Sequence, residues 1–304
     1  MPPLLNGQEI RIRHAGYTAS VVTLGASLRS LKHDDRPLVV AFAAEQMRPV
    51  FRGALLAPWP NRVVDGRYTF DGADEQLPLT EPDRGHALHG LLAWADWRVE
   101  AVAENAVGLA VELPPSAGYP HRIVVECVYA LSDAGLTTTT AARSLLTRAP
   151  YGVSAHPYLT AGGAPLDECR LTLPADRYVA TEGERLLPGA EQDVVDAPWP
   201  DFRDPTTLGQ AQIDHAFTGL RRDGDGRTRV RLEGPDAFAV EMSWGPELGW
   251  VQVHTADRPE PELDRAGLAV EPMTCPPDAF RSGTDLVVLE PGRDHHASWT
   301  IAAA

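Results

Sequence analysis

The sequence predicts an all-β fold, a single large and mostly antiparallel β-sandwich over residues 1–304. Short segments in which apolar and polar residues alternate recur almost from end to end, as in TRVRL at 228–232, and they are rich in β-branched and aromatic side chains. Turn sequences such as DG at 65–66 and DGDG at 223–226 separate these segments. No stretch of more than about 12 residues has the periodicity of an amphipathic helix.

The expected strands follow one another along the chain, each with an apolar or alternating pattern and a turn signal nearby. The 26 glycines and 27 prolines are scattered between the strands instead of forming one linker, so we expect one domain. Examples of the expected strands are residues 17–31, 97–102, 109–113, 123–131, 136–140, 170–173, 229–232, 238–242, 250–255, 286–289 and 298–301.

Charge and cysteine content exclude several classes of protein. With 27 basic and 42 acidic residues the net charge is −15, which argues against a general binder of nucleic acid or of anionic membranes. No apolar stretch is long enough for a transmembrane helix, and residues 1–7 lack the pattern of a signal peptide. Cys127, Cys169 and Cys275 are far apart and lack CxxC spacing, so we expect no structural disulfide, no cysteine–zinc site and a cytoplasmic location.

The first candidate site residues are Asn61 and Arg62, which follow the sequence Pro58-Trp59-Pro60. Two prolines cannot continue a central strand, because each removes a backbone donor from the sheet. We therefore expect a rigid loop that presents Asn61 and Arg62 beside an aromatic plane, a combination that suits a sugar ring. A surface loop with a buried tryptophan anchor is the alternative.

The second motif is HALHGLL at 86–92, which continues to Trp94 and Trp97. Two histidines three residues apart could bind a metal on a helix, but the glutamate of an HExxH motif and a third ligand are both missing. One structural and one exposed histidine explain the pattern better. A hydrogen-bonding role for His89 in this aromatic neighbourhood stays open.

His156 and Glu271 share an unusual setting, because each immediately precedes a proline. Proline disfavours helical dihedrals in the residue before it, so both groups are expected to be held extended. A histidine fixed in this way is a candidate proton donor, and a carboxylate after an apolar run is a candidate base. The structural alternatives are a paired core histidine and a glutamate at the end of a strand.

Three further sets of residues are weaker candidates. Asp214 would cap a turn or accept hydrogen bonds from substrate hydroxyls. His254 is expected in a strand beside the same cleft, and the pair His295-His296 is expected to be solvated.

Taken together and in this order, the motifs resemble those of the aldose 1-epimerase (mutarotase) family. Any one motif is weak, but this many in the family's order are specific, and they cover roughly residues 10–301. The wording at 58–62 and 271–277 is similar to a bacterial subgroup that includes a proposed epimerase of sulfoquinovose catabolism. The matching pieces are NR at 61–62, GRYTFDG at 66–72, LHGL at 88–91, HPY at 156–158, DHAF at 214–217, VQV at 251–253, EP at 271–272, PDA at 277–279 and LEPG at 289–292.

The resemblance implies a large twisted β-sandwich, called a supersandwich, with an open cleft and with no metal and no cofactor. It also implies that Glu271 is a base and His156 an acid in the opening of a cyclic hemiacetal, and that the two exchange roles when the ring closes. His89, Arg62 and Asp214 would bind the ring oxygen and hydroxyls of a monosaccharide, with Asn61 as a weaker candidate. No nucleic acid or membrane partner is implied.

The chain departs from the better-known galactose-type members, which carry Phe and Asn where Leu159 and Thr160 stand here. Galactose is therefore not carried over as the substrate. One alternative is a mutarotase for an anionic sugar, a hexose 6-phosphate or 6-sulfonate, with Arg84, Arg48 or Arg52 as conceivable cationic groups. Another is a non-catalytic sugar-binding protein on the same fold. A glycoside hydrolase needs two carboxylates, and only Glu271 is well motivated.

Overall fold

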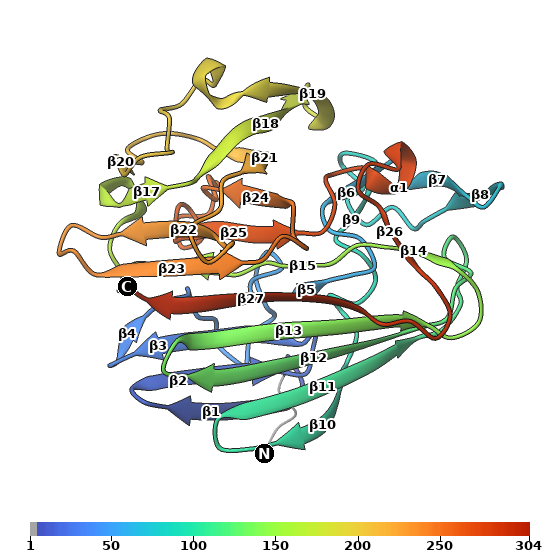
Figure 1. The fold of residues 1–304 in the computed structure, drawn as a ribbon, viewed down its shortest axis with the longest axis horizontal. Helices are drawn as coiled ribbons and strands as arrows, with labels where there is room; N and C mark the ends of the chain where they lie inside the picture. Colours follow the sequence, from blue (N-terminus) through green and yellow to red (C-terminus); the bar gives the residue numbers. More distant parts are fainter. Residues whose placement is uncertain (1–4) are drawn as a thin grey trace.

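The computed structural model describes residues 5–304, and these residues consist almost entirely of β-strands and turns (Figure 1). The prediction of an all-β fold with large antiparallel sheets is confirmed. The expectation about a signal peptide rests in part on residues 1–4, which lie outside the described residues. The expectation of a single domain over 1–304 stays a prediction.

A nine-stranded sheet is the largest element of the fold, and it extends from the bottom of Figure 1 to the upper left. In its strand β12 (Ile123–Ser132), buried and accessible residues alternate, because one face of the strand packs on the core and the other faces water. In sheet order the strands are β10 (Arg98–Val102), β11 (Ala106–Leu113), β12, β13 (Gly135–Ser144), β27 (His295–Ala303), β23 (Ala239–Trp244), β22 (Thr228–Glu233), β17 (Arg170–Thr172) and β20 (Thr206–Thr207).

A six-stranded sheet is the second largest, and it lies in the upper half of Figure 1, level with the last strands of the larger sheet. Its strand β25 (Leu268–Met273) is buried at every position, so it has no solvent face at all. In sheet order the strands are β16 (Tyr158–Leu159), β25, β24 (Trp250–His254), β21 (Asp214–Leu220), β18 (Ala175–Glu182) and β19 (Leu187–Asp193). Three adjacent strands of this sheet carry polar residues: Asp214 in β21, Gln252 in β24 and Glu271 in β25.

Smaller sheets complete the fold and carry the loops around these two sheets. A four-stranded sheet is formed by β1 (Glu9–His14), β2 (Tyr17–Val22), β3 (Ser27–His33) and β4 (Arg36–Pro37). Two-stranded pairs are β5 (Leu55–Leu56) with β15 (Ser154–Ala155), β6 (Arg62–Val64) with β9 (His86–Leu88), β7 (Arg67–Phe70) with β8 (Ala73–Gln76), and β14 (Ala149–Tyr151) with β26 (Val287–Leu289). The helices are α1 (Ala279–Ser282) and the 3₁₀ turns η1 (Leu166–Glu168) and η2 (Val194–Asp196).

The structure corrects the expected strand at 17–31, which is two strands, β2 and β3, joined by a tight turn. Gly25 and Ala26 in this turn have positive φ angles of 67° and 44°, which reverse the chain. A side chain at Gly25 would collide with the carbonyl oxygen of Ala93, 2.2 Å from the position of its Cβ, so the turn requires glycine there. Apolar residues on both sides of the turn hide it from pattern analysis.

Within residues 5–304, no helix is both long and apolar enough to cross a membrane.

Candidate active site

A cavity of about 450 Å³ opens beside the six-stranded sheet, which is within the range of small-molecule sites. It is lined by all six residues that the sequence singled out as a site, although they come from distant parts of the chain. They are Asn61, Arg62, His89, His156, Asp214 and Glu271.

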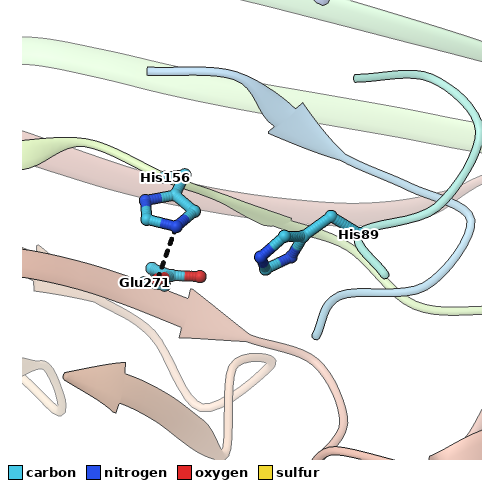
Figure 2. A group of neighbouring side chains, drawn as sticks. All are labelled: His89, His156 and Glu271. Atoms are coloured by element: carbon cyan, nitrogen blue, oxygen red, sulfur yellow. Dashed lines mark ion pairs between the residues drawn. The ribbon is translucent and has the colours of Figure 1, made fainter. Parts of the chain in front are cut away.

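The centre of the site is a direct contact between Glu271 and His156. Oε1 of Glu271 lies 3.2 Å from Nε2 of His156, and both side chains are almost completely buried (Figure 2). Glu271 projects from β25, and His156 directly follows β15. The backbone of His156 is fixed on both sides, because its N–H donates to Ala54 and its carbonyl accepts from the N–H of Gly53. The sequence predicted two rigidly held groups, and they face each other.

Burial shifts the pKa values of this pair in opposite directions. Desolvation, followed by the nearby charge of Asp214, raises the pKa of Glu271 well above its usual value. Desolvation, followed by the charge of His254, lowers the pKa of His156 to about 3. Both shifts disfavour the charged forms, so they favour a protonated Glu271 carboxyl paired with a neutral His156 imidazole, two groups that share one proton.

His89 lies beside this pair, with its ring 5.3 Å from that of His156, and Figure 2 shows the His89 ring directed toward Glu271. The residue follows β9 with a φ angle of 60°, and its Nδ1 accepts a hydrogen bond of 3.2 Å from the backbone N–H of Asn61. Because Nδ1 is the acceptor, the ring proton of the neutral imidazole is on Nε2. Desolvation and the neighbouring His156 hold the pKa of His89 well below its usual value, so it is a neutral donor.

His89, His156 and Glu271 also form the group of side chains in residues 5–304 that could hold a metal ion. Their ligand atoms all lie within 4.8 Å of one another. The contact of 3.2 Å between His156 and Glu271 within this group is also the geometry of an acid–base pair.

Asp214 is the first residue of β21, and it extends a row of polar groups across three adjacent strands. Its Oδ1 accepts a hydrogen bond of 2.7 Å from Nε2 of Gln252 in β24, and Gln252 lies directly opposite Glu271 in β25. Although burial raises the pKa of Asp214, the charges of His254 and Arg62 and the bond from Gln252 outweigh it and lower the pKa overall. Asp214 is therefore a carboxylate that accepts hydrogen bonds, and it begins a strand instead of capping a turn.

Arg62 begins β6 and is held by a carboxylate that the sequence analysis did not identify. Its Nε and Nη2 lie 2.8 and 3.1 Å from the two carboxylate oxygens of Glu81, and the pair is largely buried. Such two-point pairing fixes the plane of the guanidinium. Asn61 has a φ angle of 53°, and its side-chain oxygen accepts from the backbone N–H of Arg62. This bond occupies one end of the Asn61 amide.

Gln252 and Arg258 also line the cavity and were missed as individual candidates. Gln252 belongs to the strand sequence WVQVH, in which a polar residue interrupts an apolar run and is itself buried. That interruption was the available signal. Arg258 is in a loop after β24, where no local pattern distinguishes it from a surface arginine.

The remaining weaker candidates separate into two groups. His254 is in β24 and lines the cavity, as expected. His295 is not solvated as expected: it is half-buried in β27 with its ring 5.9 Å from that of Tyr151, because alternation along the strand turns it inward, whereas His296 is exposed.

Of the three arginines suggested for an anionic sugar, only Arg84 lines the cavity. Arg48 and Arg52 are buried and donate to backbone carbonyls, Arg48 to Leu24 and Ala93 and Arg52 to Ala41. They support loops and are not available to a ligand in this cavity.

Comparisons with known proteins agree with this geometry. A family model described as aldose 1-epimerase matches residues 8–302. The chain is 36% identical over 298 residues to the uncharacterized protein YihR of Escherichia coli K12, across 97% of this chain and 93% of that protein. It is 26% identical to the galactose mutarotase of Rattus norvegicus, across 96% and 93% of the two chains. The fold is similar to that of a GalM/aldose epimerase homologue from C. elegans, with a TM-score of 0.85 and 20% identity over 97% of this chain and 98% of that one.

Proposed function

The chain belongs to the aldose 1-epimerase family, and we propose that it is a mutarotase that interconverts the α and β anomers of a hexose. It is an isomerase that acts on carbohydrates. The observation that carries the proposal is the buried pair of Glu271 and His156 at 3.2 Å in a cavity of monosaccharide size. A cytoplasmic location and the absence of nucleic acid and membrane partners remain predictions.

The shared proton of the pair suits the reaction. In the ionised form, the carboxylate of Glu271 takes the proton of the anomeric hydroxyl while the imidazolium of His156 protonates the ring oxygen, and the bond between C1 and the ring oxygen breaks. The product is an open-chain aldehyde with a protonated Glu271 and a neutral His156. After rotation about C1–C2, His156 takes the proton of the C5 hydroxyl, whose oxygen attacks the opposite face of C1. Glu271 protonates the aldehyde oxygen, which becomes the new anomeric hydroxyl. The pair holds one proton before and after.

The surrounding residues supply donors and acceptors for the other sugar oxygens. In this proposal the Nε2–H of neutral His89 and the guanidinium of Arg62 donate to the ring oxygen and to neighbouring hydroxyls, and the carboxylate of Asp214 accepts from other hydroxyls. Asn61 contributes through the free end of its amide. Support comes from the burial of these groups around one cavity, because directed hydrogen bonds in a site shielded from water orient a substrate well.

A second candidate substrate is an anionic hexose, such as a 6-phosphate or 6-sulfonate. Arg258 lines the cavity, and among residues 5–304 no carboxylate lies within ion-pairing distance of its guanidinium. Its Nη2 lies 3.5 Å from Nε2 of His254. A guanidinium without a carboxylate partner at a sugar cavity is available to a sulfonate or phosphate. The resemblance to the subgroup with a proposed epimerase of sulfoquinovose catabolism favours the same candidate. A neutral hexose stays the first proposal because Asp214 and Asp257 also line the cavity.

The decisive experiment is anomer exchange measured by NMR on the purified protein, with glucose, galactose, a hexose 6-phosphate and sulfoquinovose. We expect acceleration with at least one sugar, a loss of about 10²–10⁴ in Glu271→Gln and His156→Asn, and no change in His296→Ala. The order of the sugars separates neutral from anionic substrates, and Arg258→Gln should affect only the anionic ones. Binding without any exchange would refute the mutarotase and identify a non-catalytic sugar-binding protein.

A further inference from the structure

An exposed tryptophan stands beside the cavity. Trp94 is 47% exposed, whereas the other six tryptophans of the chain are buried. Exposed tryptophan next to a ligand cavity is unusual, because leaving a large aromatic surface in water forgoes the free energy of burying it. The acid–base chemistry proposed above makes no use of this side chain.

The buried guanidinium of Arg48 packs against the indole ring of Trp94. The guanidinium carbon of Arg48 lies 4.4 Å from the centre of the indole ring, and Arg48 is only 2% exposed. Its Nη2 and Nη1 donate to the carbonyls of Ala93 and Leu24 at 2.7 and 3.1 Å, so the guanidinium cannot follow a moving ring. Arg48 therefore packs over the indole ring, and close to half of Trp94 stays exposed.

The loop that carries Arg48 is also fixed. The buried amide of Asn6 donates to the carbonyls of Ala44 and Gln46 and accepts from the N–H of Arg48. Immediately afterwards Val50 and Phe51 adopt φ angles of 40° and 58°, a left-handed conformation that is strained for both side chains. Strain of this kind persists only where surrounding contacts enforce it.

Phe51 connects the exposed tryptophan to the catalytic cavity. Its ring lies 4.8 Å from that of His89 and 5.6 Å from that of Trp94, and it lines the cavity itself. Trp94 is therefore two ring contacts away from His89. The aromatic surface is continuous from the cavity wall to the outside of the protein.

We propose that Trp94 and Phe51 form a second carbohydrate subsite, which takes a second pyranose ring linked to the hexose in the cavity. This inference rests on the proposed mutarotase function. Because the reaction needs a free anomeric carbon, the ring in the cavity is the reducing end, and the second ring is the non-reducing end of a disaccharide. The apolar C–H face of a pyranose packs on an aromatic ring while its hydroxyls stay in water. A fixed indole that is partly exposed offers such a platform.

The test compares anomer exchange for glucose with that for two reducing disaccharides of glucose, maltose (1→4 linked) and isomaltose (1→6 linked). We expect at least one disaccharide to be a substrate. In Trp94→Ala the kcat/KM for that disaccharide, divided by the kcat/KM for glucose, should fall about tenfold, mainly through KM. Trp94→Phe should recover part of the loss, since it keeps an aromatic face. Leu146→Ala, which removes an exposed leucine that does not line the cavity, should leave the ratio unchanged.

Fluorescence gives an independent measurement, because Trp94 is the tryptophan open to an added quencher. The disaccharide should protect wild-type fluorescence from acrylamide, and the protection should disappear in Trp94→Ala. An unchanged kcat/KM ratio in Trp94→Ala, or exchange of glucose but of neither disaccharide, would overturn the subsite. If no sugar is exchanged, the mutarotase proposal fails, and quenching alone then decides the subsite. Protection that depends on protein concentration and not on sugar would identify a second copy of the chain as the occupant and would also overturn it.

Discussion

Strands β12 and β25 are interior strands of the two largest sheets, and each contains a glutamate. The two glutamates differ in their exposure to water. In β12 buried and accessible positions alternate, and Glu126 is on the accessible side, 3.5 Å from Arg143. In β25 all six positions are buried, and Glu271 is among them with its Oε2 free of any hydrogen bond. One glutamate is solvated and has an ordinary surface partner, and the other is withdrawn from water.

The contrast separates a strand that stabilises the fold from a strand to which we assign a part in the chemistry. A carboxyl on the wet face of a sheet costs little and contributes little. A carboxyl inside a strand without a wet face loses its hydration, and its pKa rises. Because such a residue makes folding less favourable, its presence in β25 is best explained by a function. Substitutions in β25 and β12 should therefore have different effects on activity and stability.

The largest effect is expected at Glu271. Glu271→Gln should lower turnover by about 10²–10⁴ and yet raise the melting temperature. The pKa of Glu271 is higher in the folded than in the unfolded chain, so its ionisation weakens folding as the pH rises above about 4.5. The amide does not titrate, and calorimetry should therefore show a larger gain at pH 8 than at pH 4.5. A variant that melts lower at pH 8 would contradict this account.

Truncation in the other strand should have the opposite signature. Leu131 is 1% exposed at the inner face of β12, and Leu131→Ala should cost about 2–5 kcal/mol of unfolding free energy through lost burial and a cavity. Activity per folded molecule should stay at the wild-type level. Urea denaturation and anomer exchange on the same sample measure the two quantities. Loss of activity without loss of stability would show that β12 takes part in the site.

An intermediate effect is expected at Glu81, which acts through Arg62. Glu81→Gln removes the charge that fixes the guanidinium, so KM should rise about tenfold while kcat changes less. The matched control is Glu112→Gln, which breaks the exposed pair of Glu112 with Arg122. That variant should behave as wild type, because exposed pairs contribute little. Equal effects of the two substitutions would contradict a positioning role for Glu81.

The smallest expected change is in the pH profile of the wild-type protein. In the proposed mechanism, activity requires one proton on the pair of Glu271 and His156. At low pH a second proton binds to the pair, at His156, and activity is lost. Because burial lowers the pKa of His156 to about 3, kcat/KM should not fall as the pH decreases through about 6.5, the usual value of a histidine. A decline with its midpoint near pH 6.5 would indicate a solvated His156.

Alternation and turn signals were enough to predict the scaffold, as β12 and β22 illustrate. A strand with one face on the core and one in water has alternating apolar and polar residues, which the sequence shows directly. The same signals failed at Gly25, where apolar residues continue through a turn. They also failed for β18, β21 and β25, in which polar residues serve the cavity or the pattern is uniformly buried.

The sequence by itself predicted the fold class, because alternation marks the strands. It also singled out His156 and Glu271 as candidate acid–base groups, since the proline after each restricts its backbone locally. Only the tertiary structure decided that the two side chains meet at 3.2 Å, that Gln252 joins Asp214 to their row, and that Glu81 fixes Arg62. These contacts join residues far apart in the chain. Their pKa values depend on burial and on neighbouring charges that only the assembled sheets bring together.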